Sequence, residues 1–312
     1  MSFTTEIKNE ISILNTTRLE SISELSGFVR NNASLNEGKM YLTTENASIA
    51  KRLIKSFKEI YDVKLKLETT KNTNLSKKTL YLLILEDKVN FILEALNYYD
   101  NKHKYLERPN EYLVESEDEI KSYLRGVFLS QGSINDPKTS RYHMELLIDK
   151  PDEAIFVQKL VNIFDMNAKL LNRDKGYMVY LKESEKISDF LKLIQAYKAV
   201  MYYENIRAHK ESINKTNRLN NCEQANTDKI IESATNQVKD IEILDKYIGI
   251  DLLDDKLKEA CIYRLKYPET SLLELSNIIS LETEKKITKS GLNHRFRKIK
   301  EMAKKLKEDN ES

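Results

Sequence analysis

The chain contains few residues of the kinds that break or cross-link a backbone. Among its 312 residues there are seven Gly, four Pro, two Cys and no Trp. A shortage of Gly and Pro favours long regular elements over loops. Cys222 and Cys261 are far apart in the sequence and have no neighbouring His, which excludes a disulfide framework and a zinc site. We expect both thiols to be buried and the protein to work in a reducing cytoplasm.

Long hydrophobic runs and an excess of either charge are also absent. No run approaches the ~18 apolar residues that suggest a membrane span. The first residues include Glu6 and Glu10 and lack the apolar core of a signal peptide. The formal net charge is only +2, so any surface that binds nucleic acid must be local. The length predicts two or three globular domains with no membrane partner.

One segment occurs twice in the first half of the chain. Residues 25–34 read LSGFVRNNAS and residues 124–133 read LRGVFLSQGS. Both open with Leu-x-Gly and two bulky apolar residues, and both close with a polar residue, a small residue and Ser. Because the two motifs begin at Leu25 and Leu124, the repeating unit has the size of a domain and not of a short solenoid repeat. Gly27 and Gly126 allow two helix backbones to approach closely, which predicts that the two motif helices pack against each other on a pseudo-twofold axis.

Each motif is followed by the same order of predicted elements: a hairpin with one clear strand, a helix, a second hairpin and a closing helix. In the first copy these are residues 39–44, 45–61, 63–67 with 79–85, and 87–96; in the second they are residues 141–148, 151–164, 168–171 with 177–181, and 183–195. The pattern predicts an α+β body in residues 1–200, made of two repeats at about residues 19–97 and 119–197. Each repeat should contribute one four-stranded sheet.

The last third of the chain reads as helical, with a polar connection before it. We interpret residues 201–221 as a linker or extended arm and residues 226–248 as one long helix that ends at Gly249. Helices are then predicted at residues 255–265, 271–279 and 290–306, which together form an all-α domain in residues 250–312. Ser271 and Glu274 form a capping box at the start of the second of these helices.

The final helix is strongly basic. Residues 285–307 hold ten Lys or Arg and one acid, Glu301. A short capped helix followed by a basic amphipathic helix is typical of a helix-turn-helix, whose second helix reads base edges in the major groove of double-stranded DNA. The residues expected to contact DNA are Lys285, Lys286, Lys289, Ser290, Asn293, His294, Arg297, Lys298 and Lys300. The alternative is a solvated basic helix, and residues 280–289 are long for the tight turn of this motif.

Within this set, the expected roles differ. Arg297 suits guanine and Asn293 suits adenine, because each can make two hydrogen bonds to one base edge. The lysines would meet phosphates, which position the protein and make its affinity fall with salt.

The double motif and its flanks resemble the LAGLIDADG homing-endonuclease fold. That resemblance implies two acidic residues at the motif ends that hold divalent metal over DNA. The matching positions here are Asn32 and Gln131, and neutral amides lack the charge that Mg²⁺ prefers. We therefore predict vestigial metal-site positions, no metal, no cofactor and no enzyme activity. The alternative, a metal-dependent endonuclease, requires other acids such as Asp136 or Glu37.

The chain as a whole resembles the bacterial WhiA family. The resemblance rests on the degenerate double motif, on RLNNCEQANTDK at residues 218–229 and on TKSGLNHRFRKIKEMA at residues 288–303. It implies a sequence-specific DNA-binding regulator of transcription, associated with the nucleoid and involved in cell division and chromosome segregation. A protein of the division machinery that interacts mainly with other proteins, with DNA binding secondary, is the remaining alternative.

Overall fold

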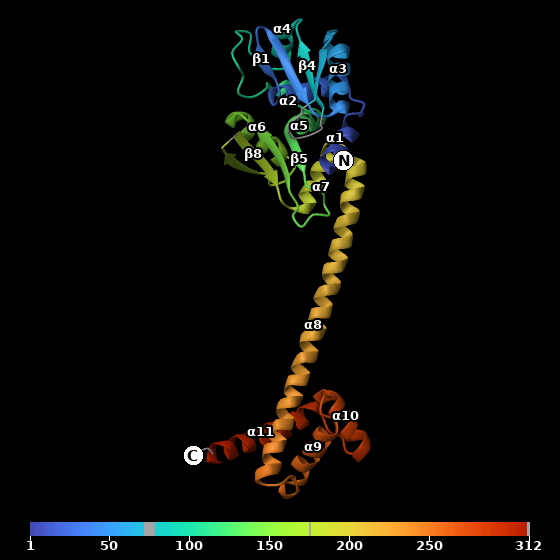
Figure 1. Ribbon diagram of the computed structural model, residues 1–312, viewed down its shortest axis with the longest axis vertical. Helices are drawn as coiled ribbons and strands as arrows, with labels where there is room; N and C mark the ends of the chain where they lie inside the picture. The colour runs from blue at the N-terminus through green and yellow to red at the C-terminus, as the bar shows by residue number, and fades with distance from the viewer. Residues whose placement is uncertain (72–78, 175, 311–312) are drawn as a thin grey trace. The chain divides into compact units, whose positions relative to one another are not determined.

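The computed structural model describes residues 1–71, 79–174 and 176–310 (Figure 1). The chain divides into two compact units, Met1–Lys210 and Glu211–Ser312, each with its own hydrophobic core.

The first unit is a duplicated α+β body. Its first half contains α1 (Phe3–Ile11), α2 (Arg18–Arg30), β1 (Ser34–Asn36), β2 (Lys39–Thr44), α3 (Ala47–Tyr61), β3 (Lys66–Lys71), β4 (Thr79–Leu85) and α4 (Val89–Ala95). After the short η1 (Glu111–Leu113), its second half contains α5 (Glu117–Gln131), β5 (Gly132–Ile134), β6 (Met144–Ile148), α6 (Pro151–Asn162), β7 (Lys169–Arg173), β8 (Gly176–Leu181) and α7 (Ser184–Leu193). The predicted order of elements in each copy is confirmed.

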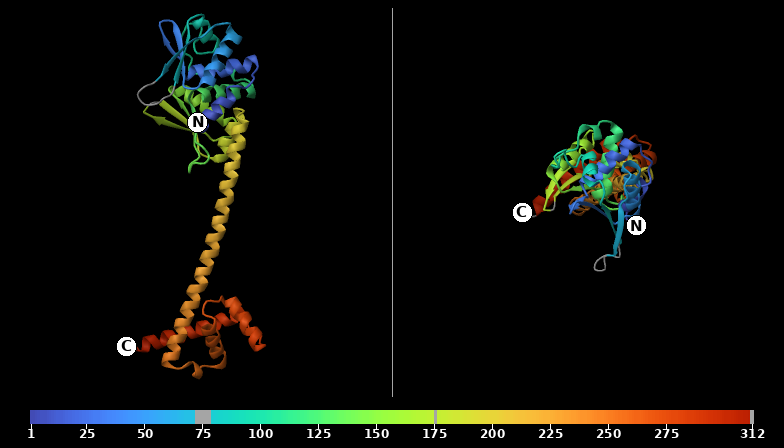
Figure 2. Two further views of the ribbon diagram at one scale, coloured as in Figure 1. Left: turned by 45° about the vertical axis from the view of Figure 1, so that its right-hand side comes forward. Right: turned by 90° about the horizontal axis from the view of Figure 1, so that it is seen from above.

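The two halves have the same sheet topology. The strand orders are β1-β2-β4-β3 and β5-β6-β8-β7, and all neighbouring pairs are antiparallel. Figure 2 draws the strands of both halves as arrows. The predicted pair of four-stranded sheets is thus confirmed. Two strand starts were placed too early, because β3 begins at Lys66 and not at Val63, and β6 begins at Met144 and not at Arg141.

The motif helices α2 and α5 pack backbone against backbone at the predicted glycines. A methyl group at Gly126 would lie 2.0 Å from the carbonyl oxygen of Glu24, and one at Gly27 would lie 2.3 Å from that of Tyr123. Real side chains do not approach a backbone so closely, so only Gly fits at either position. The close approach places the C-terminal ends of both motif helices side by side.

Two buried ion clusters surround this helix pair. In one, Glu24 of α2 accepts hydrogen bonds from Arg52 of α3 and, at 2.6 Å, from Arg125 of α5. In the other, Glu153 of α6 accepts from Arg30 of α2 at 2.7 Å and from the Tyr123 hydroxyl of α5. Burial raises the pKa of Tyr123 well above its ordinary value, so this hydroxyl keeps its proton and donates it. Each cluster ties one motif helix to the other and to a flanking helix.

The predicted linker at residues 201–221 is wrong, because α8 (Tyr197–Tyr247) is one uninterrupted helix. It contains neither Gly nor Pro, and residues 211–233 are exposed on every side. Its polar sequence therefore reflects exposure to water rather than loss of helix. Cys222 lies in this stretch and is exposed, so its predicted burial is also wrong, whereas Cys261 is buried as expected.

The second unit contains three helices besides the end of α8. After η2 (Ile250–Leu252) come α9 (Asp255–Lys266), α10 (Leu272–Thr283) and α11 (Lys289–Asn310). Their core includes Ile241 and Leu244 of α8, Cys261 of α9, Ile279 of α10 and Phe296 of α11. Gly249, with a φ of 88°, follows the end of α8 as predicted.

The glycine contact yields the first testable prediction. Gly126→Ala should lower the free energy of unfolding of the full chain by about 3 kcal/mol or more, because the added methyl forces α2 and α5 apart. Denaturant unfolding monitored by far-ultraviolet circular dichroism measures the change. Ala47→Gly, which removes a methyl at an exposed helical position of the same unit, should cost no more than about 1 kcal/mol. Equal effects of the two substitutions would contradict the close packing.

Candidate nucleic-acid interface

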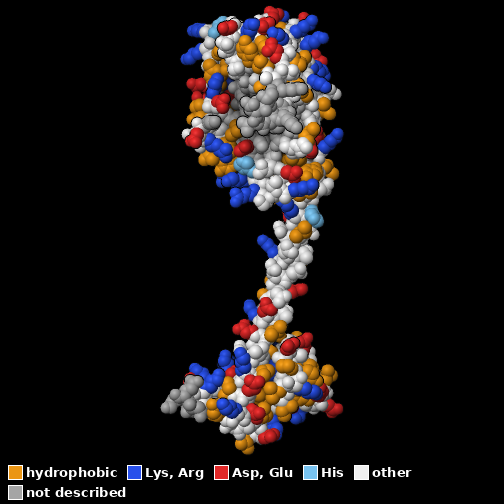
Figure 3. Space-filling model, in the orientation of Figure 1, with side chains coloured by type: hydrophobic (Ala, Val, Ile, Leu, Met, Phe, Trp, Pro, Cys, Tyr) orange, Lys and Arg blue, Asp and Glu red, His pale blue; other side chains and the backbone are white. Residues whose placement is uncertain are grey.

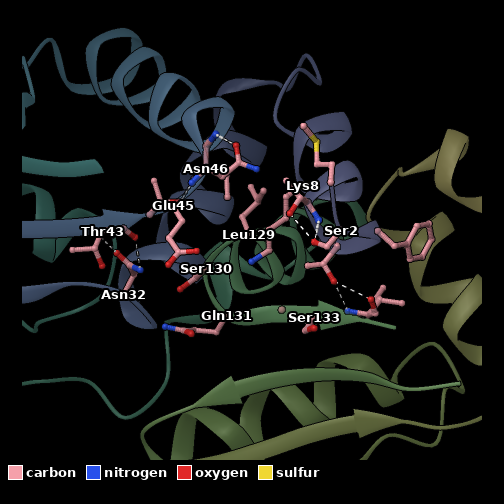
Figure 4. A pocket seen from close by; sticks show the side chains of 18 of the residues that line it. Ser2, Lys8, Asn32, Thr43, Glu45, Asn46, Leu129, Ser130, Gln131 and Ser133 are labelled. Carbon is pink, nitrogen blue, oxygen red and sulfur yellow. Dashed lines mark hydrogen bonds between the residues drawn. The ribbon is translucent and has the colours of Figure 1, made fainter. Parts of the chain in front are cut away.

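The two positions where endonucleases of this fold carry acids lie in an open cleft of the first unit. The cleft has a volume of about 1010 Å³ and is lined by the ends of α2 and α5 and by α1 (Figure 4). Asn32 and Gln131 both face it, so the structure brings the two predicted positions together.

The side-chain amide of Asn32 makes two hydrogen bonds to the backbone of a single residue, Thr43. Its oxygen accepts a hydrogen bond from the Thr43 N–H at 2.8 Å, and its nitrogen donates to the Thr43 carbonyl at 3.0 Å (Figure 4). A carboxylate could accept the first bond but could not donate the second. The amide therefore fixes the end of the motif helix to strand β2.

Gln131 also acts as a donor. Its side-chain nitrogen donates to the Asn31 carbonyl at 3.2 Å, and the neighbouring Ser130 hydroxyl donates to the same carbonyl at 3.1 Å. The end of α5 is thus joined to the end of α2 by hydrogen bonds that a carboxylate could not make.

The donor set of this cleft does not fit a catalytic metal. Its lining carboxylates are Glu45 and Asp136, and Asp136 accepts hydrogen bonds from the Lys138 N–H and the Tyr202 hydroxyl. Glu37 lies in the turn between β1 and β2 and is not part of the cleft lining. Over the described parts of the chain, no cluster of three or more His, Cys, Asp or Glu side chains could hold a metal ion.

The second candidate site is the pair of helices α10 and α11. The predicted capping box is present: the Ser271 hydroxyl accepts from the Glu274 N–H, and the Glu274 carboxylate accepts from the Ser271 N–H. Helix α10 continues to Thr283, which shortens the predicted ten-residue connection to residues 284–288.

This shorter turn has a defined geometry. Glu284 takes up a left-handed conformation with a φ of 56° and ends α10. The Ser280 hydroxyl accepts from the Ile287 N–H at 2.9 Å, and Thr288 accepts from the Gly291 N–H and so caps α11. These bonds set the register of α11, which the sequence alone left open.

The face of α11 that packs on the core is the predicted one. Leu292, Phe296, Ile299 and Ala303 are buried. All nine residues expected to contact DNA are exposed: Lys285, Lys286, Lys289, Ser290, Asn293, His294, Arg297, Lys298 and Lys300. Their exposure makes them available to a ligand.

Two basic residues of α11 have neighbours within the unit. Arg295 donates to Glu259 of α9 at 2.6 Å and to the Lys256 carbonyl, so it joins α11 to α9. Lys300 and Lys307 lie close enough to Asp240 of α8 to oppose the rise in its pKa that burial causes. Lys300 thus lies near an acidic residue of its own unit. The sequence alone did not predict this neighbour.

The duplicated α+β body and the helix-turn-helix that follows it define the class: a LAGLIDADG-like protein with a C-terminal helix-turn-helix domain. Residues 18–99 match the WhiA N-terminal LAGLIDADG-like domain, residues 120–212 the WhiA LAGLIDADG-like domain and residues 216–303 the WhiA C-terminal HTH domain. The chain belongs to the WhiA family, which confirms the resemblance seen in the sequence.

Relatives and a solved structure agree over nearly the full length. The probable cell division protein WhiA of Oceanobacillus iheyensis is 38% identical over 311 residues, and that of Bacillus mycoides is 40% identical over 311 residues; each alignment covers 98% of both chains. The crystal structure of full-length DUF199/WhiA from Thermatoga maritima matches with a TM-score of 0.57 and 23% identity, and covers 98% of this chain and 99% of that one. It supports the fold. None of the described helices has the length and apolar character that crossing a membrane requires.

A second prediction follows from the amide clamp of Asn32, by which we mean the two hydrogen bonds between its side-chain amide and the backbone of Thr43. Asn32→Asp should lower the free energy of unfolding at pH 7.5 by about 1–3 kcal/mol, because a carboxylate would face the Thr43 carbonyl without a proton to donate. The protonated acid can donate, so folding raises the pKa of the introduced carboxyl and the deficit should shrink as the pH falls towards 4. Urea unfolding at several pH values measures this. The control Asn36→Asp, on exposed β1, should change stability by less than about 0.5 kcal/mol; a pH-independent deficit at Asn32 would argue against the clamp.

Proposed function

We propose that this chain is a sequence-specific double-stranded DNA-binding protein that acts in cell division as a regulator of transcription, with a role in chromosome segregation and without nuclease activity. The single observation that carries the proposal is the exposed basic face of α11, behind the capped helix α10. The printed names of the relatives, probable cell division proteins, support the cellular role. A protein of this function works in the cytoplasm at the nucleoid.

The chemistry of the proposed interface follows from the register of α11. Ser290, His294 and Arg297 lie opposite the buried face, with Asn293 at its flank. Arg297 can donate two hydrogen bonds to guanine, and the Asn293 amide can donate and accept on adenine. Lys285, Lys286 and Lys289, in the turn and first turn of α11, would bind phosphates and hold the helix in the groove.

The surface charge of the body supports the same division of roles. On the face drawn in Figure 3, acidic and basic side chains of the first unit are interspersed. Some of these charges form ion pairs on or beside the first sheet, as in Lys39 with Glu86 and Lys66 with Glu68. Such a surface gives less attraction to phosphates than α11 does. We assign the LAGLIDADG-like body a supporting role in DNA binding or regulation.

The competing role as an interaction protein has one specific observation in its favour. Residues 211–233 of α8 are exposed on all sides, and they include Ile213, Leu219, Ile230 and Ile231. A protein that lacks residues 250–312 separates the two roles. Under our proposal this truncation abolishes the cellular function; full function of the truncated protein would favour the interaction role.

A third prediction concerns base recognition. Arg297→Ala should weaken binding to the cognate site by about 5- to 150-fold, which corresponds to about 1–3 kcal/mol, and should reduce discrimination against random duplex. Arg218→Ala removes the same charge from exposed α8 and should leave both affinities unchanged. Fluorescence anisotropy with a site first found by genome-wide mapping measures both. Unchanged binding of Arg297→Ala to cognate and random DNA would refute the assigned recognition face.

A fourth prediction concerns phosphate contacts. Lys286→Ala should weaken binding to cognate and random DNA alike and should reduce the slope of log affinity against log salt by about 1. The matched control Lys246→Ala, on exposed α8, should preserve the slope. A titration from low to physiological salt measures the slopes, and identical slopes in all three proteins would exclude Lys286 from the interface.

A further inference from the structure

The second unit contains a pocket outside the exposed face of α11. Its volume is about 370 Å³, and it lies between α8, the end of α9 and the N-terminal ends of α10 and α11. Its cationic lining residues are Lys229, Arg264 and Lys289, and its apolar wall includes Ile230, Leu272 and Leu273. All of these residues belong to the same compact unit.

Arg264 is buried without an acid. Only 1% of its surface is exposed. One terminal nitrogen donates to the Thr270 carbonyl at 2.7 Å and to the Tyr267 carbonyl at 3.2 Å, and the guanidinium lies over the Phe296 ring. Its Nε–H is buried and has no hydrogen-bond acceptor. Among the residues that the structure describes, no carboxylate pairs with this guanidinium, and burial lowers its pKa.

The other buried arginines each form an ion pair with a buried glutamate. Arg52 and Arg125 pair with Glu24, and Arg30 pairs with Glu153. A buried cation without a partner anion is costly, because it loses its hydration and gains no ion pair. Arg264 departs from this pattern, and it also lines a pocket.

The rest of the pocket adds positive potential and an apolar surface. Lys229 and Lys289 are exposed, so they can bring an anion to the opening. Ile230 and Leu273, which also line the pocket, offer apolar contact. A ligand that satisfies both parts has an anionic group and an apolar body.

We propose that this pocket binds a small organic phosphate monoester, whose phosphate pairs with Arg264 and Lys229 and whose apolar body lies against Ile230 and Leu273. A free monoester suits the site better than a phosphate of the DNA backbone, because a rigid duplex cannot bring its phosphate to a guanidinium that is 1% exposed.

Occupancy of the pocket would act on DNA binding. The pocket is built on the N-terminal ends of α10 and α11, and Lys289 belongs both to it and to the proposed DNA interface. A phosphate that draws Lys289 into the pocket removes a DNA phosphate contact, so ligand and DNA should oppose each other. Linkage requires that each weakens the other by the same factor.

The direct test is calorimetric titration of the full chain with phenyl phosphate, and with inorganic phosphate to measure the share of the apolar body. We expect saturable 1:1 binding, tighter for phenyl phosphate. Lys229→Ala should weaken it about tenfold, and Ile230→Glu, which places a negative charge in the pocket, should abolish it. Both positions are exposed enough to tolerate substitution, unlike Arg264, for which Arg264→Met serves as an additional variant if it folds. The matched control Lys239→Ala, on exposed α8 outside the pocket, should bind as the unchanged protein does.

Two results would overturn the proposal. One is the absence of saturable phenyl phosphate binding, or binding that Lys229→Ala and Ile230→Glu leave intact. The other is a protein that does not bind phenyl phosphate but loses DNA affinity and salt dependence in Lys229→Ala, which would make the pocket a contact for the DNA backbone. Neither result bears on Arg297, so the proposed reading of DNA by α11 is tested separately.

Discussion

The body of this protein depends on one contact, the packing of α2 on α5 through Gly27 and Gly126. At these points each helix approaches the carbonyl oxygens of the other more closely than any side chain permits. The approach fixes the axis that relates the two halves and brings the ends of both helices together at one cleft. The same contact brings Asn32 and Gln131, the two positions at which the sequence resemblance implies acids, to one cleft.

The positions of the carboxylates around this helix pair show what the buried charges do. Glu24 and Glu153 are buried among Arg and Tyr, where they join α2 and α5 to the flanking helices. At the cleft, Asn32 and Gln131 donate hydrogen bonds to backbone carbonyls, which a metal-binding carboxylate could not do. Buried charge thus joins the helices of the scaffold, and neutral amides hold the ends of α2 and α5 at the cleft.

Local signals allowed much of this fold to be predicted from the sequence. The Leu-x-Gly motif predicted the helix pair because it occurs twice in the sequence, and Ser271 with Glu274 predicted the start of α10 because the two residues lie close together in the chain. Helix α8 was mistaken for a linker, since polarity on all sides is typical of loops as well as of a fully exposed helix. The orphaned charge of Arg264 could not be foreseen, because burial and the absence of a partner are properties of the packed unit. The exposed face of α11 was predictable, and its register needed the Ser280 and Thr288 hydrogen bonds.

Helix α8 raises the question of what stabilises an exposed helix. Residues 211–233 are all exposed and contain five Asn, a residue of low helix propensity. An isolated helix of this kind is only marginally stable in water, because forming the first turn costs more free energy than its hydrogen bonds contribute. Here both ends are already nucleated. The Glu10 carboxylate accepts from the Lys198 and Ala199 N–H groups at 2.7 and 3.1 Å, and Ile241 and Leu244 are buried in the second unit. The helix therefore only has to continue through the exposed stretch between two packed segments. Few residues other than Gly and Pro prevent such continuation.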